Sequence, residues 1–361
     1  MENNLDKQYL ELLGYVLEHG HSSDDRTGTG TIKSFGHTIK HNMQDGFPIL
    51  TSKKVFTKGI IYELLWFLSG DRNMKLMVDN GVNIWVGDAY KAFMIKSGFK
   101  ETELGWVGKM GGLNQDVSGW LTKEEFINKI KTDDEFSKKW GDLGRVYGVQ
   151  WRKWKKHTEN NIEYIDQVQN ILDKLKTNPD DRRMIVTAWN PGEIDDQLLP
   201  PCHNMWQVFT RKLSTVERHK IAYKDKLPGA YRVTTNGLDF NEMDERLDEL
   251  NIPKRAISLS FNMRSVDIPL GMPFDITSYG FLLSMIAQQV NMLPENLICN
   301  FGDTHIYKNQ IESVKEQIQR KTHKLPQLQL NKKESLFDYK YDDFKLIDYV
   351  SEDKIFYPLS N

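Results

Sequence analysis

A cysteine that follows two prolines is the residue of this sequence best placed to act as a nucleophile. Cys202 lies in LPPCHNMWQVF, residues 199–209. The prolines exclude a helix just ahead of it, and the residues after it alternate as in a strand. The pattern predicts a thiol at the mouth of a sheet, where a nucleophile also needs a lowered pKa because the thiolate attacks. The alternative, and the commoner role of a lone cysteine, is a small buried packing residue.

Arginines on both sides of this segment favour the nucleophile. Arg182 and Arg183 are adjacent in a polar turn before it, and Arg264 and Ser265 end a strand-like segment after it. Guanidinium and hydroxyl groups of this kind bind phosphate, and a nearby cation stabilises a thiolate. We therefore expect a nucleophile beside an anion-binding site.

Composition limits the classes of partner. The chain has 361 residues, 39% of them hydrophobic, with a net charge of −2, so no basic field suggests nucleic acid or an anionic membrane. Two cysteines exclude a disulfide framework and indicate a reducing compartment. Without a stretch of membrane-spanning length or a signal peptide at the hydrophilic start, we expect a soluble, cytoplasmic protein whose ligand is small.

Periodicity predicts a chain of mixed helices and strands. Helices are expected at 5–19, 59–70, 160–177 and 276–293, and buried strands at 184–190 and after the Pro-Pro pair. Two polar segments, at about 91–142 and 211–254, interrupt this pattern. We interpret the chain as one domain, 1–361, with two insertions.

Three further features could serve a site. Glu63 is the one carboxylate in an apolar helix, so we expect it to be partnered or to hold a raised pKa for proton transfer; a place at the solvent edge is the alternative. A glycine-rich loop at 24–31 carries Arg26 and suits close approach to a phosphate, although it matches no dinucleotide or triphosphate fingerprint. His305 and Tyr307 are two residues apart, so they share one side of an extended segment.

Together, these motifs resemble the thymidylate synthase superfamily of folate-dependent pyrimidine nucleotide methylases and hydroxymethylases. The motifs are DDRTGTGT, FPILTSKKVF, ELLWFLSGDRN, NIW, LGRVYGVQWR, NPDDRRM, AWNP, PPCH, RSVD, LGMPF and GDTHIY. They cover nearly the whole chain outside the two insertions. The resemblance implies an α/β fold of the α+β type, in which a mixed sheet is flanked by helices and two sheets pack back to back in a homodimer.

The resemblance also implies a reaction and a role for each matched residue. A thiolate adds to carbon 6 of a pyrimidine nucleotide, and carbon 5 then takes a one-carbon unit from 5,10-methylenetetrahydrofolate, without a metal. The implied roles are Cys202 as nucleophile; Glu63, Tyr147 and His203 as the proton-handling and water-ordering set; Arg26, Arg264 and Ser265 at the phosphate, with Arg182 and Arg183 of the partner chain; His305 and Tyr307 at the sugar; and Trp85, Asp267, Leu270, Gly271 and Phe274 at the folate, Asp267 being counted with the substrate site as well.

One departure from the family concerns the base. Thymidylate synthases have asparagine in a PFN motif, whereas this chain has Asp275. A carboxyl group that shares a proton with a ring nitrogen and accepts from an amino group suits cytosine, while an ionised carboxylate would repel the carbonyl of uracil. Met263, where glutamine is usual, agrees with the cytidylate branch. The C-terminal YPLSN replaces the usual hydrophobic residues that seal the site during hydride transfer, and it leaves open whether the intermediate is reduced to methyl or captured by water. Neutral drift to aspartate is the alternative.

The sequence therefore predicts a deoxycytidylate hydroxymethylase, with three alternatives kept open. Thymidylate synthase, acting on dUMP, and a dCMP 5-methylase share the same chemistry. A DNA cytosine methyltransferase also uses a Pro-Cys nucleophile, but it would require an S-adenosylmethionine loop and a basic surface, neither of which is visible here.

Overall fold

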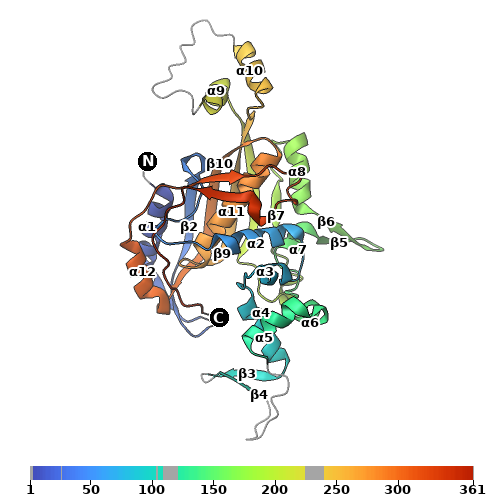
Figure 1. Ribbon diagram of the computed structural model, residues 1–361, viewed down its shortest axis with the longest axis vertical. Coiled ribbons are helices and arrows are strands. Elements are labelled where there is room, and N and C mark those ends of the chain that lie inside the picture. Colours follow the sequence, from blue (N-terminus) through green and yellow to red (C-terminus); the bar gives the residue numbers. More distant parts are fainter. Residues whose placement is uncertain (1–2, 26, 103–104, 109–120, 224–239, 361) are drawn as a thin grey trace.

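The computed structural model describes residues 3–25, 27–102, 105–108, 121–223 and 240–360. Its centre is a mixed six-stranded sheet in the order β1-β2-β10-β9-β8-β7 (Figure 1). The β9–β10 pair is parallel and the other four pairs are antiparallel. The strands are β1 (His21–Ser23), β2 (Thr31–Asn42), β7 (Ile185–Thr187), β8 (His203–Lys212), β9 (Arg255–Asp267) and β10 (Leu293–Tyr307).

Helices and small two-stranded ribbons surround this sheet. The α-helices are α1 (Asn4–His19), α2 (Thr57–Ser69), α3 (Lys75–Asp79), α4 (Val86–Lys96), α5 (Lys123–Thr132), α6 (Asp134–Trp140), α7 (Gly148–Arg152), α8 (Gln167–Thr177), α9 (Thr215–Tyr223), α10 (Phe240–Glu249), α11 (Gly271–Gln289) and α12 (Ile311–Ile318). The ribbons pair β3 (Phe99–Thr102) with β4 (Gly105–Gly108), β5 (Trp154–His157) with β6 (Ile162–Ile165), and β11 (Gln327–Leu330) with β12 (Phe344–Ile347). Short 3₁₀ turns lie at Met43–Asp45, Ile194–Asp196, Lys308–Gln310 and Tyr341–Asp343.

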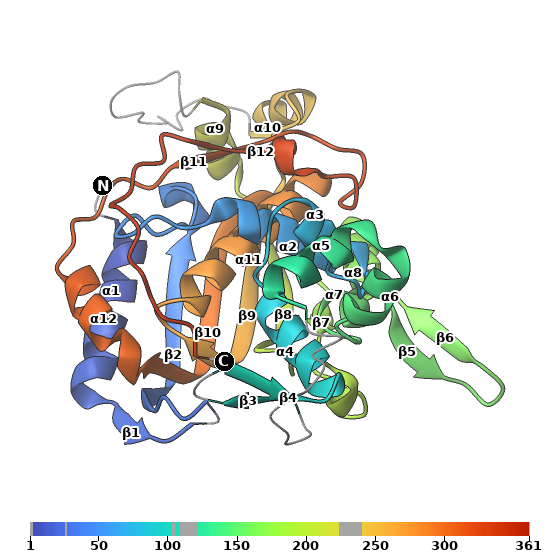
Figure 2. The ribbon, with the colours of Figure 1, turned by 60° about the horizontal axis from the view of Figure 1, so that its bottom comes forward.

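The core lies between the sheet and the apolar helices α2 and α11, which cross in front of it in Figure 2. Phe261 of β9 stacks on Tyr279 of α11 with ring centroids 4.1 Å apart. Alternate residues of β9 and β8, such as Leu259 and Trp206, are fully buried on the same side. This alternation is what a sheet with one covered face requires.

The opposite face of the sheet carries exposed apolar side chains. Strand register places Phe209 of β8 and Ile185 of β7 on the side away from α11, where they are 63% and 42% exposed. Phe35 of β2, next to the positive-φ Gly36, is 82% exposed. Exposed apolar side chains on neighbouring strands are typical of an interface.

Most of the predicted elements are present, with three boundary corrections. The helix expected at 160–177 begins only at Gln167, because Ile162–Ile165 forms a strand and Asp166 caps the helix by accepting from the N–H of Gln169. The helix expected at 276–293 begins earlier, at Gly271, and ends at Gln289. The strand expected at 184–190 is only three residues long, Ile185–Thr187. Among the described residues, no helix has the length and hydropathy needed to cross a bilayer.

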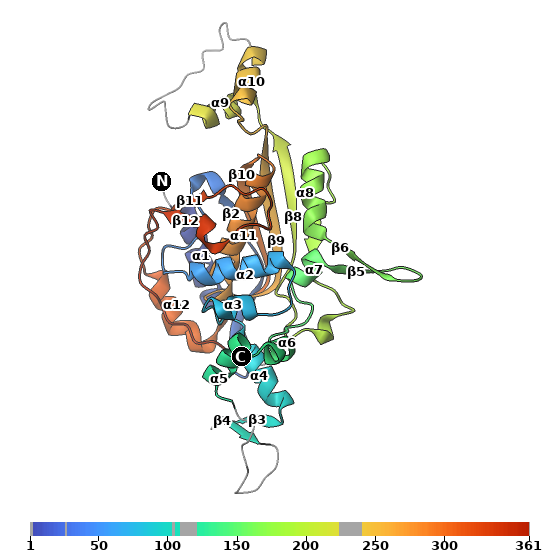
Figure 3. The same cartoon turned by 45° about the vertical axis from the view of Figure 1, so that its right-hand side comes forward.

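The two segments predicted as insertions project from opposite ends of the sheet in Figure 1 and Figure 3. The first contains α5 and α6, which pack on α4 through aromatic rings such as Phe93, Phe126 and Phe136. The second contains α9 and α10, joined by the ion pair of Arg218 with Asp244 at 2.9 Å. The segments begin inside α4 and β8 respectively, so each extends a core element rather than starting in a loop.

Candidate active site

Cys202 lies immediately before β8, after the two prolines, and its side chain is partly exposed. Its backbone N–H donates to the hydroxyl oxygen of Tyr147 at 2.8 Å. Its carbonyl oxygen accepts from the backbone N–H of Arg264, also at 2.8 Å. The predicted place of the thiol at the mouth of a sheet strand is confirmed.

The thiol of Cys202 has a raised pKa in this single chain. Burial raises this pKa most, the charge of Arg264 lowers it, and the charge of Asp275 raises it. The Nη2 atom of Arg264 lies 4.0 Å from Sγ. The expected lowering of the thiol pKa is therefore wrong for the chain by itself, because the loss of hydration of the thiolate outweighs one guanidinium.

Tyr147 is positioned by a close contact between two helices. A Cβ on Gly148 would lie 2.2 Å from the carbonyl oxygen of Phe67 in α2, so only glycine allows α7 to approach α2 this closely. Tyr147 itself has a positive φ of 34° at the start of α7. This backbone turns its ring onto His203, with centroids 4.1 Å apart and planes 18° apart. The phenol is thus fixed between the thiol segment and the imidazole.

His203 is a buried, neutral imidazole. Burial lowers its pKa to about 3. Its Nδ1 atom lies 2.8 Å from the hydroxyl of Tyr279, and its Nε2 atom lies 3.7 Å from Oδ1 of Asp275. Tyr279 was missed at the sequence level, although its place four residues after Asp275 puts both on one face of α11.

Two buried carboxyl groups lie beside this imidazole. Glu63 of α2 is 8% exposed; burial raises its pKa to about 7, opposed by a hydrogen bond that the indole N–H of Trp85 donates at 2.7 Å. Burial also raises the pKa of Asp275 well above its usual value, and the charge of Glu63 adds to this effect. The prediction that Glu63 is buried and partnered is confirmed. The raised pKa of Asp275 favours its protonated form.

A polar cavity of about 350 Å³ opens where β2, β9 and β10 end. Four of the predicted site residues line it: Arg264, Ser265, His305 and Tyr307. Four more lining residues, Asp24, Asp25, Thr27 and Thr31, come from the loop 24–31 that the sequence analysis singled out, and two were missed at the sequence level: Lys33 and Asp303. Cationic, hydroxyl and imidazole groups on one wall suit an anionic ligand that also carries hydroxyls.

The imidazole in this cavity is held by a carboxylate. The Nδ1 atom of His305 lies 2.8 Å from Oδ1 of Asp303, and Nζ of Lys33 lies 3.6 Å from Oδ2. Asp303 could have been found from its place two residues before His305, on the same side of the strand. Lys33 has no such signal, because only the β2–β10 register places it opposite His305.

Four of the five residues expected at the folate lie where β9 ends and α11 begins. Asp267 ends β9, is half-buried, and its Oδ1 atom accepts from the backbone N–H of Leu270 at 3.1 Å. A Cβ on Gly271 would lie 3.9 Å from Oδ2 of Asp275. Trp85, Leu270 and Phe274 are partly buried and pack against the core. Apolar side chains with a carboxylate beside them suit a flat heterocycle with polar edges.

The remaining predicted arginines are not brought to the thiol within one chain. Arg182 and Arg183 are exposed in the turn before β7, and Nε of Arg183 lies 3.4 Å from Oδ1 of Asp181. Neither lines the polar cavity. Arg26 lies outside the described residues.

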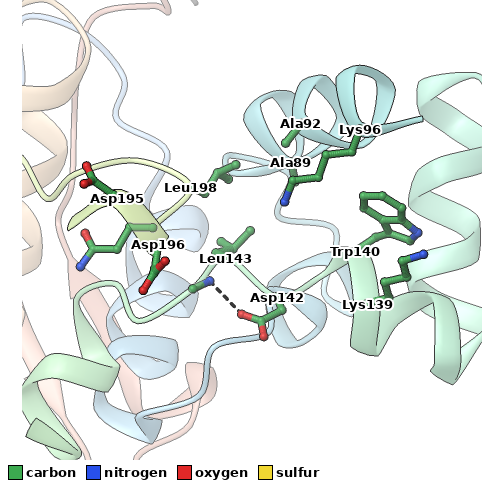
Figure 4. Close-up of a pocket in the computed structure, with 12 residues that line it drawn as sticks. Ala89, Ala92, Lys96, Lys139, Trp140, Asp142, Leu143, Asp195, Asp196 and Leu198 are labelled. Carbon is green, nitrogen blue, oxygen red and sulfur yellow. Dashed lines mark hydrogen bonds between the residues drawn. The ribbon is translucent and has the colours of Figure 1, made fainter. Parts of the chain in front are cut away.

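A second cavity, of about 470 Å³, lies between the first insertion and the loop that leads to Cys202 (Figure 4). Lysine side chains, including Lys96 and Lys139, line one side, and Asp142, Asp195 and Asp196 line the other. None of the predicted site residues reaches it. The smaller cavity, by contrast, is lined by Arg264, Ser265, His305 and Tyr307. In the parts of the chain that the structure describes, no cluster of His, Cys, Asp and Glu could hold a metal ion.

Comparisons with known proteins place the chain in one family. The family model described as thymidylate synthase matches residues 7–361. Three relatives named thymidylate synthase are similar over nearly their whole lengths. The protein of Mesoplasma florum is 37% identical over 349 residues, 97% of this chain and 98% of the relative. That of Mycoplasma mobile is 39% identical over 350 residues, with the same coverage. That of Listeria monocytogenes is 36% identical over 358 residues, 98% of this chain and 99% of the relative.

Proposed function

The chain belongs to the thymidylate synthase family and is a one-carbon transferase, and from this premise we propose that Cys202 attacks a pyrimidine nucleoside monophosphate at carbon 6. Carbon 5 then accepts a one-carbon unit, which the co-substrate methylenetetrahydrofolate supplies. The convergence of the thiol, Arg264 and the polar cavity at the ends of β9 and β10 carries this proposal. We further propose that residues 1–361 form one catalytic domain with two insertions. The two free cysteines support a cytoplasmic location.

The residues around the thiol support addition to the ring. When Sγ bonds to carbon 6, negative charge moves toward carbon 5 and the exocyclic atom at position 4. Burial raises the pKa of Asp275 and so favours its protonated form, which is able to donate a hydrogen bond to that atom. Glu63, with a pKa of about 7, is able to take up and return a proton near neutral pH. Tyr147 accepts a hydrogen bond from the backbone N–H of Cys202 and stacks on the neutral His203, so these two rings hold the thiol segment in place.

We propose that the polar cavity holds the sugar and phosphate. Arg264 and Ser265 supply donors for the phosphate, together with Arg26, and His305 and Tyr307 supply partners for a sugar hydroxyl. Since Asp303 contacts Nδ1 of His305, its Nε2 atom faces the ligand. The edge formed by Trp85, Asp267, Leu270, Gly271 and Phe274 is proposed to hold the folate.

A homodimer would complete this site. The exposed Ile185 and Phe209, on neighbouring strands of one sheet face, need a cover, and a second copy packed back to back would provide one. The thiol pKa is raised in the single chain, so the thiolate needs more positive charge than Arg264 supplies. We propose that the exposed Arg182 and Arg183 of the partner chain supply it and bind the phosphate.

The comparisons support dUMP as the substrate, with thymidylate as the product, better than they support the predicted hydroxymethylation of dCMP. Asp275 is compatible with uracil in its protonated form, which burial favours. That form has one donor and one acceptor, so it can donate to the carbonyl at position 4 and accept from the N–H at position 3. The repulsion expected between aspartate and uracil assumed an ionised carboxylate, and burial disfavours that form.

A second candidate, dCMP, rests on one observation: a carboxyl group occupies position 275. The ring nitrogen of cytosine at position 3 is basic, so the proton of Asp275 can move onto it and leave a charge-assisted pair with the amino group. A protonated ring nitrogen also draws electrons from carbon 6 and favours attack by the thiolate. Uracil carries a hydrogen at that position and cannot accept the proton. A carboxyl group can therefore supply a proton to the ring nitrogen of cytosine, which an amide cannot do.

The two candidates are separated by purified enzyme given methylenetetrahydrofolate with dUMP or dCMP, each tritiated at carbon 5. Faster tritium release from dUMP supports the thymidylate synthase activity, and faster release from dCMP supports the cytidylate activity. Absence of release from both would contradict one-carbon transfer to carbon 5. The same reaction identifies the product: reduction to a methyl group converts the folate to dihydrofolate with a rise in absorbance, whereas capture by water leaves tetrahydrofolate and no rise.

A further inference from the structure

The hydroxyl of Tyr279 is buried and has a single hydrogen-bond partner in the part of the chain that the structure describes. Tyr279 of α11 is 2% exposed, and its hydroxyl oxygen lies 2.8 Å from Nδ1 of His203. Burial raises the pKa of this phenol well above its usual value, so the hydroxyl keeps its proton at neutral pH. A stack on Phe261, with planes 10° apart, fixes the ring that carries the hydroxyl. The hydroxyl is therefore held against one nitrogen of the imidazole.

This contact determines which nitrogen of His203 carries the hydrogen. A neutral imidazole has one N–H and one bare nitrogen, and burial keeps His203 neutral. If Nδ1 carried the hydrogen, it would donate to the phenol oxygen, and the buried O–H of Tyr279 would have no acceptor among the described residues. An unpaired buried donor of this kind is costly. The O–H of Tyr279 therefore donates to a bare Nδ1, and the hydrogen of the imidazole is on Nε2.

The N–H at Nε2 lies next to one oxygen of Asp275. Nε2 is 3.7 Å from Oδ1, and both side chains are largely buried. This distance is longer than a hydrogen bond, but in a site with little water the positive end of an N–H dipole still favours a bare oxygen over a protonated one. The stack of Tyr147 on the imidazole keeps the ring in this plane. Oδ1 is thus the acceptor of the carboxyl group, and in the protonated form, which burial favours, the proton is on Oδ2.

A carboxyl group with one fixed acceptor oxygen distinguishes two bases that an unrestricted carboxyl group would treat alike. Cytosine needs an acceptor at its amino group, at position 4, and a proton donor at nitrogen 3. Uracil needs the reverse, a donor at position 4 and an acceptor at position 3. A carboxyl group whose proton moves freely between its oxygens can satisfy either base. With Oδ1 fixed as the acceptor, only one base is matched, because the thiol at carbon 6 and the polar cavity at the sugar and phosphate set the orientation of the ring.

We propose that Tyr279 is a positioning residue that makes Asp275 selective for one pyrimidine base, by fixing the tautomer of His203. This inference rests on the proposed function, in which Asp275 contacts positions 3 and 4 of the base. It holds whether dUMP or dCMP is the preferred nucleotide, because either preference needs one oxygen of the carboxyl group to be the acceptor. Tyr279 acts through the imidazole and needs no contact with the base itself.

Removal of one hydroxyl group tests this series of contacts. Tyr279→Phe keeps the ring that stacks on Phe261 and loses only the donor to Nδ1 of His203. Tyr90→Phe is the matched control. It also removes one hydroxyl, which donates to the carbonyl oxygen of Leu121 at 2.7 Å, outside the candidate site. Thermal unfolding of both variants shows whether they fold.

The tautomer is measured by ¹⁵N NMR of protein labelled at histidine, because a protonated and a bare imidazole nitrogen give well separated signals. The signals of His203 are identified by their loss in His203→Asn. In the unmutated protein and in Tyr90→Phe, Nδ1 is expected to be bare and Nε2 protonated. In Tyr279→Phe the two signals are expected to move toward each other as the tautomers exchange. A hydrogen on Nδ1 in the unmutated protein would overturn the inference, even if Tyr279→Phe did not fold.

Tritium release from dUMP and from dCMP measures the selectivity. The ratio of kcat/KM for the preferred nucleotide to that for the other is expected to fall about tenfold in Tyr279→Phe and to stay unchanged in Tyr90→Phe. An equal loss of activity on both nucleotides in Tyr279→Phe would show a structural role only, so the inference would be wrong while the proposed function stands. If the unmutated protein releases tritium from neither nucleotide, the proposed function is wrong, and the inference fails with it.

Discussion

The Nη2 atom of Arg264 lies 4.0 Å from the Sγ atom of Cys202, and the backbone beside the thiol holds it there. Its Nε and Nη2 atoms donate to the carbonyl oxygens of Pro201 and Pro200 at 2.9 and 3.0 Å. Proline lacks an N–H, but its carbonyl remains an acceptor. The Pro-Pro pair thus positions both the nucleophile and the cation beside it.

Removing this cation should raise the pKa of the thiol further. In Arg264→Met the largest influence on that pKa, burial, remains, while the one lowering influence is lost. The rate of alkylation of Cys202 by iodoacetamide, measured from pH 7 to 10, should therefore rise at a higher pH than in the unmutated protein. Arg255→Met, which removes an arginine paired with Asp180, is the control. An unchanged pH profile in Arg264→Met would contradict the electrostatic role.

Cys202→Ala should abolish turnover, by more than about 10³-fold, because no other group replaces the nucleophile. Nucleotide binding, measured by calorimetry, should remain, since the polar cavity is lined by other residues. Cys299→Ala is the control, because that thiol is fully buried in β10. Tritium release above a few per cent in Cys202→Ala would remove this residue from its proposed role.

Two inactive chains should complement each other if the site is shared. Cys202→Ala keeps its arginines, and the double variant Arg182→Ala, Arg183→Ala keeps its thiol. After mixing and exchange of subunits, half of the dimers are mixed, and each has one complete site, so about a quarter of the unmutated activity should return. Activity that never exceeds that of either parent would contradict the shared site.

Replacement of the carboxyl group at position 275 should change the choice of base. Asp275→Asn removes the proton that a ring nitrogen of cytosine would accept, while it keeps a donor and an acceptor for uracil. The ratio of kcat/KM for dUMP to that for dCMP should rise on the order of 10²-fold, measured by tritium release. A ratio that does not change would show that Asp275 does not contact position 3 or 4 of the base.

Glu63 should make the protein less stable as the pH rises. Its pKa is about 7 in the folded protein and near 4.5 when it is exposed, so the native state binds more protons between these values. The free energy of unfolding should therefore fall from about pH 4.5 to pH 7, by up to about 3 kcal/mol for this group.

Glu63→Gln should lack this part of the pH dependence. Urea unfolding of both proteins at several pH values measures it, with Glu312→Gln, at an exposed position, as the control. Parallel pH curves for Glu63→Gln and the unmutated protein would show that Glu63 does not hold a proton in the native state.

Local patterns in the sequence were enough for much of the fold and for the placement of several candidate site residues. Two prolines, followed by residues that alternate as in a strand, identified the strand that begins beyond Cys202. Helical and two-residue periodicities identified the faces that carry Glu63 and the pair His305 and Tyr307. These features depend on neighbours along the chain, which is why the sequence reveals them. The boundary of α8 was missed because Ile162 and Tyr164 fit a helical pattern as well as the strand that they form.

Only the tertiary structure decided the charge states and the contacts between distant segments. The pKa of the Cys202 thiol is raised rather than lowered, and the pKa of Asp275 is raised as well, because both depend on how much water the fold removes. Lys33 meets Asp303 only through the β2–β10 register. Tyr279 meets His203, 76 positions earlier in the sequence, because α11 packs on the sheet. Residue types and their spacing thus determined which chemistry this chain can carry out. Burial and long-range packing, which depend on the whole fold, decided in which protonation state each group takes part.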